Sequence, residues 1–362
     1  MNVFTIHKNI IDDYSSYIES FINIKDADIS DKVKLEIKEG KLWPKPLIQF
    51  NPGFEVYGDI DKFIEKGILA PELKYIFKNY KLYSHQAQAI EIGSSGKDFI
   101  VTSGTGSGKS LTYLATIFND LILHKSEKKG IRAIIVYPMN ALINSQFKEI
   151  GKYAQNYVAE TGKEFPINYK QYTGQENKDL RDEIKQNFPD ILLTNYMMLE
   201  LILSRISDRS LKESIYENLK FLVFDELHTY RGRQGADVSL LIRRIKSKCA
   251  NKVICIGTSA TISSGEDKKD RREQTAEVAR KIFGVKFEID QIVEEKLTYS
   301  FSHSDKETSK EDLIKAVKKK IEVNAAEEEL IKHKTALWLE KNIALSEKRS
   351  EEHTSELQSR IT

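Results

Sequence analysis

The segment SGTGSGKS contains the residues with the clearest capacity for chemistry. Its glycines let backbone N–H groups converge on phosphate oxygens, and the helix expected after it adds its N-terminus. Lys109 would reach the terminal phosphates of a bound nucleotide, and the Ser110 hydroxyl would hold Mg²⁺. The first position of the usual pattern is Ser103 instead of glycine, and a small residue still fits there. The residues expected around the phosphates are Gly104, Thr105, Gly106, Ser107, Gly108, Lys109 and Ser110.

A second segment, FLVFDELHTY, ends an apolar run in two carboxylates. Asp225 and Glu226 would lie at the carboxyl end of a strand, where α/β proteins bind ligands. Asp225 could bind the Mg²⁺ of the nucleotide through water, and Glu226 could orient and deprotonate the attacking water. Alone, such a pair is more often surface capping. After a phosphate loop it predicts hydrolysis with Glu226, Asp225 and Lys109 as the catalytic residues.

A third segment, VICIGTSATI, is another apolar run that ends in hydroxyl residues. In isolation, Ser259 and Thr261 would most often belong to a turn or cap a helix.

The elements that must position these residues alternate between short apolar runs and helical patterns. The runs are nearly continuous and rich in β-branched residues, which is typical of strands buried on both faces of a parallel sheet. They cover residues 99–101, 133–137, 191–193, 221–224 and 253–256. The apolar residues after Lys109 recur at helical spacing. We therefore expect a doubly wound α/β domain.

Composition is that of a globular protein, with 40% hydrophobic and 30% charged residues. The net charge of +2 argues neither for nor against nucleic acid, because binding needs a basic stripe more than a basic average. The two cysteines, Cys249 and Cys255, fit no zinc module and are expected to be reduced thiols. No signal peptide is visible, so we expect a cytoplasmic protein.

Taken in order, SGTGSGKS, DELH and SAT resemble motifs I, II and III of superfamily 2 DExH-box helicases. The resemblance implies a RecA-like fold, ATP and Mg²⁺. It makes His228 the link from the nucleotide site to Ser259 and Thr261, a role favoured over metal binding. LYSHQAQAI resembles the adenine-recognising element of that family, with Gln86 as the reader and Tyr83 as a packing partner.

Two more segments, VYPMNALINSQ and TNYMMLELIL, resemble the family motifs that hold the sugar-phosphate backbone of one nucleic-acid strand. Helix capping and core packing are the alternative interpretations of these residues. The nucleic-acid contacts implied by the resemblance are Pro138, Asn140, Ala141, Thr194, Asn195 and Tyr196.

The segment DELHTYRGRQG resembles the corresponding segment of Lhr-like helicases and of related bacterial DNA-repair or phage-defence helicases. We therefore expect an ATP-driven helicase or translocase acting on single-stranded DNA. The alternatives are an ATP-gated clamp without unwinding and an RNA helicase. A small-molecule kinase is disfavoured by the SAT segment and by Gln86.

Four regions are expected along the chain. Residues 1–79 form a lead-in, 80–290 the RecA-like domain, and 291–348 a helical linker; helices at both ends extend the α/β fold. Nothing after Thr261 resembles the second RecA-like domain of such motors, so we expect that domain to be missing and this fragment to be nearly inactive. The stretch from Arg349 resembles a translated sequencing adapter, which makes 349–362 a non-native tail.

Overall fold

The computed structural model describes residues 3–41, 53–104, 106–125, 129–260, 268–299, 309–319 and 332–344. The chain divides into two compact units, Met1–Asn51 and Pro52–Thr362. The first unit contains α1 (Val3–Phe21) and α2 (Ala27–Lys38). Asp26 begins α2, because its side chain accepts a hydrogen bond from the Ile29 N–H and so satisfies a free donor of the first turn.

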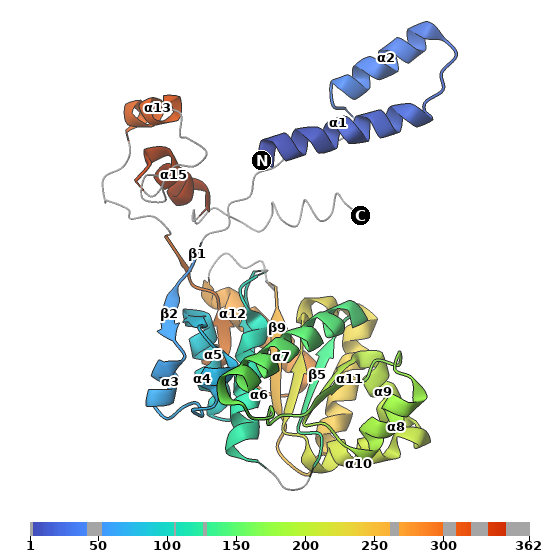
Figure 1. Ribbon diagram of the computed structural model, residues 1–362, viewed down its shortest axis with the longest axis vertical. Coiled ribbons are helices and arrows are strands. Elements are labelled where there is room, and N and C mark those ends of the chain that lie inside the picture. The colour runs from blue at the N-terminus through green and yellow to red at the C-terminus, as the bar shows by residue number, and fades with distance from the viewer. Residues whose placement is uncertain are drawn as a thin grey trace. The chain divides into compact units, whose positions relative to one another are not determined.

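A seven-stranded parallel sheet forms the centre of the second unit (Figure 1). Its spatial order is β10 (Ile292–Glu294), β4 (Phe99–Thr102), β9 (Ile254–Ser259), β8 (Phe221–Phe224), β5 (Ala133–Tyr137), β7 (Ile191–Asn195) and β6 (Tyr169–Gln171). Every residue of β4, β5, β8 and β9 is buried. The expected parallel α/β sheet, made of continuous apolar strands, is confirmed.

Helices cover both faces of this sheet and bury two apolar clusters. One face packs against α4 (Leu73–Ile76), α5 (Ser84–Ser94), α6 (Lys109–Leu123) and α7 (Asn140–Thr161). The other packs against α8 (Lys178–Gln186), α9 (Tyr196–Ser204), α10 (Arg209–Asn218), α11 (Gly232–Lys248) and α12 (Lys268–Phe283). Short 3₁₀ turns lie at Ile206–Asp208, Leu227–Thr229 and Ile289–Gln291. This two-layer burial holds the strand ends in fixed register.

Residues 53–79, which the sequence suggested as part of a separate lead-in, pack within the second unit. There, β2 (Val56–Asp59) pairs with β3 (Lys81–Tyr83), and α3 (Asp61–Glu65) follows β2. Phe77 is fully buried and stacks on Phe118 of α6, with ring centroids 5.9 Å apart. This apolar contact explains why the segment belongs to the α/β body.

Several short elements follow the sheet in the described residues. The strand β11 (Leu297–Thr298) pairs antiparallel with β1 (Gly53–Phe54). Further on lie α13 (Lys310–Lys318), α15 (Lys334–Leu339) and a π-helical turn at Glu340–Ala344. The expected helical extensions at both ends are confirmed, and the tail 349–362 lies outside the described residues. Among the described helices, none is both long and apolar enough to cross a bilayer.

Candidate nucleotide site and strand-binding surface

The glycine-rich loop connects β4 to α6. Gly106 and Gly108 have positive φ angles of 82° and 71°, a conformation that glycine adopts without strain. The Lys109 ammonium donates to the carbonyl oxygens of Ser103, at 2.9 Å, and Gly104, at 3.3 Å. Thr105 lies outside the described residues. The loop therefore has the backbone shape of a phosphate cradle, and its lysine points back into it.

The start of α5 holds this loop from one side. The Gln86 amide nitrogen donates to the carbonyls of Ser107 and Gly108, each at 3.1 Å, and its oxygen accepts from the Tyr83 N–H at 2.9 Å. His85 is fully buried, and its Nε2 lies 3.1 Å from the Ser107 oxygen. Gln86 thus joins Tyr83 to the loop. Recognition of adenine by Gln86 stays a prediction.

An aromatic group lies beside this junction. Tyr83 stacks on His85 with centroids 5.8 Å apart, and Phe54 contacts both rings, at 5.2 Å and 5.6 Å. Sequence reasoning missed Phe54 and gave His85 no role, because a single aromatic residue or histidine carries no spacing signal. The pairing of β2 with β3, which sets Val56 opposite Tyr83, brings Phe54 to the site.

The acidic pair follows β8, as its apolar run predicts. Asp225 is only 6% exposed and accepts a hydrogen bond from the Thr258 hydroxyl. Burial, with a smaller contribution from the neighbouring Glu226 carboxylate, raises the pKa of Asp225 from 3.8 to about 6. Glu226 has a φ of 53°, which is strained for a residue with a side chain. Its N–H donates to the same Thr258 hydroxyl at 3.3 Å.

His228 connects this pair to the end of β9. Its Nδ1 lies 3.2 Å from the Ser259 hydroxyl and 3.3 Å from a Glu226 oxygen. Burial lowers the pKa of His228, which favours the neutral ring. The geometry brings His228 and Ser259 together, whereas Thr261 lies outside the described residues. Thr258, one residue before the predicted hydroxyl cluster, was missed because it reads as part of the strand.

The predicted Mg²⁺ ligands lie around one buried tyrosine. Tyr113 hydrogen-bonds Ser110, and its pKa is raised by burial and by the nearby Asp225 carboxylate. A buried carboxylate with a raised pKa, close to a hydroxyl and a phosphate loop, fits a cation that arrives with a nucleotide. Among the described residues, no group of three or more histidine, cysteine or acidic side chains could hold a metal by itself.

The ends of β5 and β7 form the neighbouring surface. The Asn195 amide donates to the Asn140 oxygen at 2.8 Å, and its own oxygen accepts from the Met198 N–H at 2.8 Å. Thr194 is fully buried and donates to the Tyr172 carbonyl at 2.7 Å, so it braces the strand ends from inside. Tyr196 packs edge-on against Tyr230, with centroids 6.2 Å apart.

The segment before α7 completes this surface. Pro138 and Asn140 are half-buried, whereas Ala141 is exposed. The structure thus brings the two predicted backbone-binding segments side by side. Within them, Ala141 is open to solvent and Thr194 is not.

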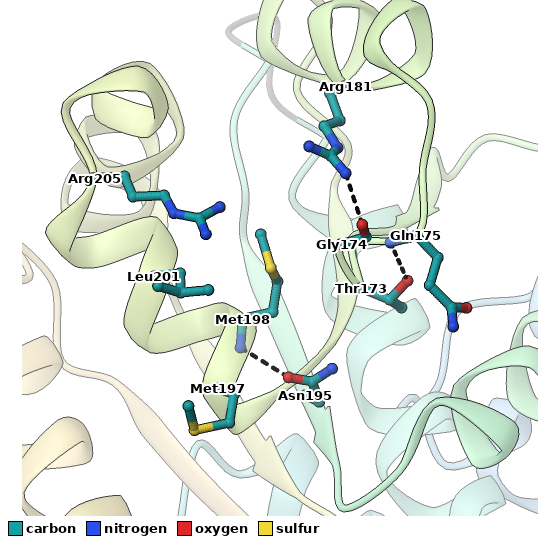
Figure 2. Close-up of a pocket in the computed structure, with 9 residues that line it drawn as sticks. All are labelled: Thr173, Gly174, Gln175, Arg181, Asn195, Met197, Met198, Leu201 and Arg205. Carbon is teal, nitrogen blue, oxygen red and sulfur yellow. Dashed lines mark hydrogen bonds between the residues drawn. The ribbon is translucent and has the colours of Figure 1, made fainter.

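A cavity of about 380 Å³ opens beside Asn195 (Figure 2). It lies between α9 and the loop after β6, and Figure 2 shows two arginine side chains at its wall. The residues that line it are Thr173, Gly174, Gln175, Arg181, Asn195, Met197, Met198, Leu201 and Arg205. Of these residues, sequence reasoning gave a role in nucleic-acid binding only to Asn195, and it offered core packing for Met197 and Met198.

Residues 83–269, just over half of the chain, match the DEAD/DEAH box helicase family, and the chain belongs to it. The chain is 29% identical to the Druantia protein DruE of Escherichia coli strain UMEA 4076-1, over 51% of this chain and 16% of DruE. It is 31% identical to the uncharacterized ATP-dependent helicase YprA of Bacillus subtilis strain 168, over 52% of this chain and 24% of YprA.

A crystal structure of the DUF1998 helicase MrfA bound to DNA shares the fold, with a TM-score of 0.54. It is 24% identical and covers 68% of this chain and 29% of MrfA. The expected RecA-like fold and the resemblance to Lhr-like and bacterial defence helicases are confirmed. The chain spans 16% and 24% of the two relatives named above.

Proposed function

We propose that this chain is the first motor domain of an ATP-driven helicase or translocase that moves along single-stranded DNA. One observation carries the proposal, the order of the strands β4, β9, β8, β5 and β7 in the sheet. The first three end in the phosphate loop, Ser259 and the acidic pair, and the last two end in the strand-binding segments. Because parallel strands end at one edge, the nucleotide and the strand would be bound side by side.

In this proposal the nucleotide replaces contacts that the loop makes with itself. The Lys109 ammonium would exchange the Ser103 and Gly104 carbonyls for phosphate oxygens, which are stronger partners because they are charged. Ser110 and Asp225 would hold Mg²⁺, which neutralises phosphate charge when bound.

Glu226 would take the proton of the attacking water. Its strained backbone fixes the carboxylate beside His228, and this arrangement supports a positioned base. His228 would couple the nucleotide site to Ser259 through their 3.2 Å contact.

We further propose that a second RecA-like domain completes the cleft and that the protein works in the cytoplasm. The motor class supports the first point, because such sites gain an arginine from the partner domain, with a large effect on rate. Cys249 and Cys255 are free thiols, which is compatible with a reducing compartment. The DNA-bound MrfA structure supports DNA as the polymer.

Nucleotide titration of the chain tests the proposed roles. Lys109→Ala should sharply weaken ATP binding, because it removes the fixed charge nearest the terminal phosphates. Glu226→Gln should leave binding nearly intact, since an amide cannot accept the proton but keeps the shape. Lys97→Ala, an exposed lysine before β4, is the control and should bind like wild type. Equal loss of binding in the Lys109 and Glu226 variants would contradict this division of roles.

Binding of single-stranded oligonucleotides tests the polymer. Affinity should fall steeply with salt and depend little on base sequence, because backbone contacts dominate. DNA should bind more tightly than RNA. Preference for RNA would favour an RNA helicase, and tight ATP-dependent binding without strand displacement once the second domain is supplied would favour a clamp.

A further inference from the structure

The loop after β6 places three donors around one carboxylate. Glu176 is 7% exposed and accepts from the N–H groups of Thr173 and Gly174, at 2.8 Å each. The Thr173 hydroxyl donates to the same side chain at 2.7 Å. A loop of this shape would otherwise be a cradle for an anion. Here the cradle is already filled by the chain's own buried carboxylate.

The side chains that face the cavity are, in contrast to Glu176, neutral or positively charged. The Arg205 guanidinium is exposed and has neither a hydrogen-bond nor an ion-pair partner within the part of the chain that is described. One terminal nitrogen of Arg181 donates a hydrogen bond to the Gly174 carbonyl at 2.7 Å. The Arg181 Nε is buried and has no hydrogen-bond acceptor among the described residues. None of the nine lining residues is acidic. The cavity thus holds two positive charges and unused donors.

The position of the cavity points to its occupant. Asn195 lines it and also hydrogen-bonds Asn140, so the cavity continues the surface formed by the ends of β5 and β7. Met198 and Leu201 supply apolar surface near the Arg205 guanidinium, as Figure 2 shows. Charge on one side and apolar surface on the other suit a phosphodiester with its sugar.

We propose that Arg205 and Arg181 bind a backbone phosphate of the nucleic-acid strand in this cavity. The loop amides do not bind this phosphate, because they already donate to Glu176. The inference rests on the proposed function, because it assumes that a strand follows this edge of the sheet. A guanidinium pair can hold a phosphate through several charged hydrogen bonds, which a methionine-lined wall alone cannot. Gln175 and Asn195 would then approach the adjoining sugar.

The test measures binding of a fluorescent oligothymidylate to the full chain across a salt series. Arg205→Gln should weaken binding roughly tenfold, because one charged contact is lost. It should also reduce the slope of log affinity against log salt by about 0.7. Arg205→Lys should keep the wild-type slope with weaker binding, since the charge stays and the planar fork is lost.

The matched control is Arg209→Gln. Arg209 is also an exposed arginine of this region, but it pairs with Glu213 at 2.7 Å and does not line the cavity. It should bind like wild type. Arg181→Lys provides a second variant that keeps a donor for the Gly174 carbonyl and so guards against a collapsed loop.

Three outcomes separate the inference from the function beneath it. If wild type binds DNA with a salt dependence but Arg205→Gln equals Arg209→Gln, the cavity assignment is wrong and the motor proposal stands. If wild type does not bind nucleic acid, the proposed function fails. If inorganic phosphate binds at Arg205 while the oligonucleotide ignores that residue, the cavity holds a free anion and the inference is overturned.

Discussion

Asp225→Asn should stabilise the nucleotide-free protein at neutral pH. The wild-type carboxylate is buried behind Thr258, and burial raises its pKa from 3.8 to about 6. Between these two values the folded state keeps a proton that the unfolded state has lost. Stability therefore falls as pH rises through this window and stays reduced above it. An amide carries no charge to bury, and its oxygen can still accept the Thr258 hydroxyl.

The magnitude follows from the same pKa. Each pH unit in the window changes the free energy of unfolding by about 1.4 kcal/mol, so the full deficit is about 3 kcal/mol. For a body of this size that corresponds to a melting temperature roughly 6–12 °C higher for the variant at pH 7. At pH 4 the two proteins should melt at nearly the same temperature.

Thermal unfolding from pH 4 to pH 8, without nucleotide, measures this difference. Asp120→Asn is the control with the opposite sign, because the Asp120 carboxylate pairs with Arg132 at 3.1 Å and with Lys220 at 2.5 Å. That variant should be less stable than wild type at pH 7. A gap between Asp225→Asn and wild type that does not change with pH would refute the assigned cause, and so would a variant that melts below wild type at pH 7.

Two other substitutions test contacts around the nucleotide site and in the sheet. Glu295 accepts the Gly104 N–H at 2.7 Å, so Glu295→Gln should tighten ATP binding by a few-fold, on the order of 1 kcal/mol, in a nucleotide titration. The Glu294 carboxylate pairs with an arginine instead, so the control Glu294→Gln should leave ATP affinity unchanged. Weaker ATP binding by the Glu295 variant would contradict the idea that Glu295 competes with the nucleotide for the Gly104 N–H. Gly257→Ala should lower the free energy of unfolding by about 1–3 kcal/mol, because the added carbon would overlap the Leu227 side chain. Chemical denaturation checks this, and unchanged stability would show that the strand can shift.

Much of the fold could be predicted because its central strands are buried on both faces. Such strands are uninterrupted apolar runs, and the run at residues 133–137 matches β5 residue for residue. The edge strand β10 was harder to predict. It has three residues, lies beyond the expected boundary at residue 290, and pairs with β4 at Ile292 and Ile100. Two apolar residues among charged ones carry no periodic signal, so only the tertiary pairing reveals it.

The nucleotide site was predictable where its functional residues are grouped in short segments of the sequence. Lys109, Asp225 and Glu226 belong to segments that end strands, and the topology of a parallel sheet brings such ends together. Single residues that act through long-range contacts were not predictable. Thr258, for example, anchors both acidic residues through one hydroxyl, yet in the sequence it is one more β-branched residue of a strand.

A carboxylate of the chain binds backbone N–H groups in both loops that resemble anion cradles, and the difference between the two carboxylates decides how each loop can work. Glu176 is buried and bound by several donors of its own loop, so releasing it would leave a charge without partners at a high cost. Glu295 is half-buried and accepts one N–H from the phosphate loop. A nucleotide phosphate can therefore displace Glu295, whereas a strand phosphate cannot displace Glu176. We therefore expect ATP to bind backbone amides that the Glu295 side chain releases, and the strand to bind arginine side chains beside amides that stay bound to Glu176.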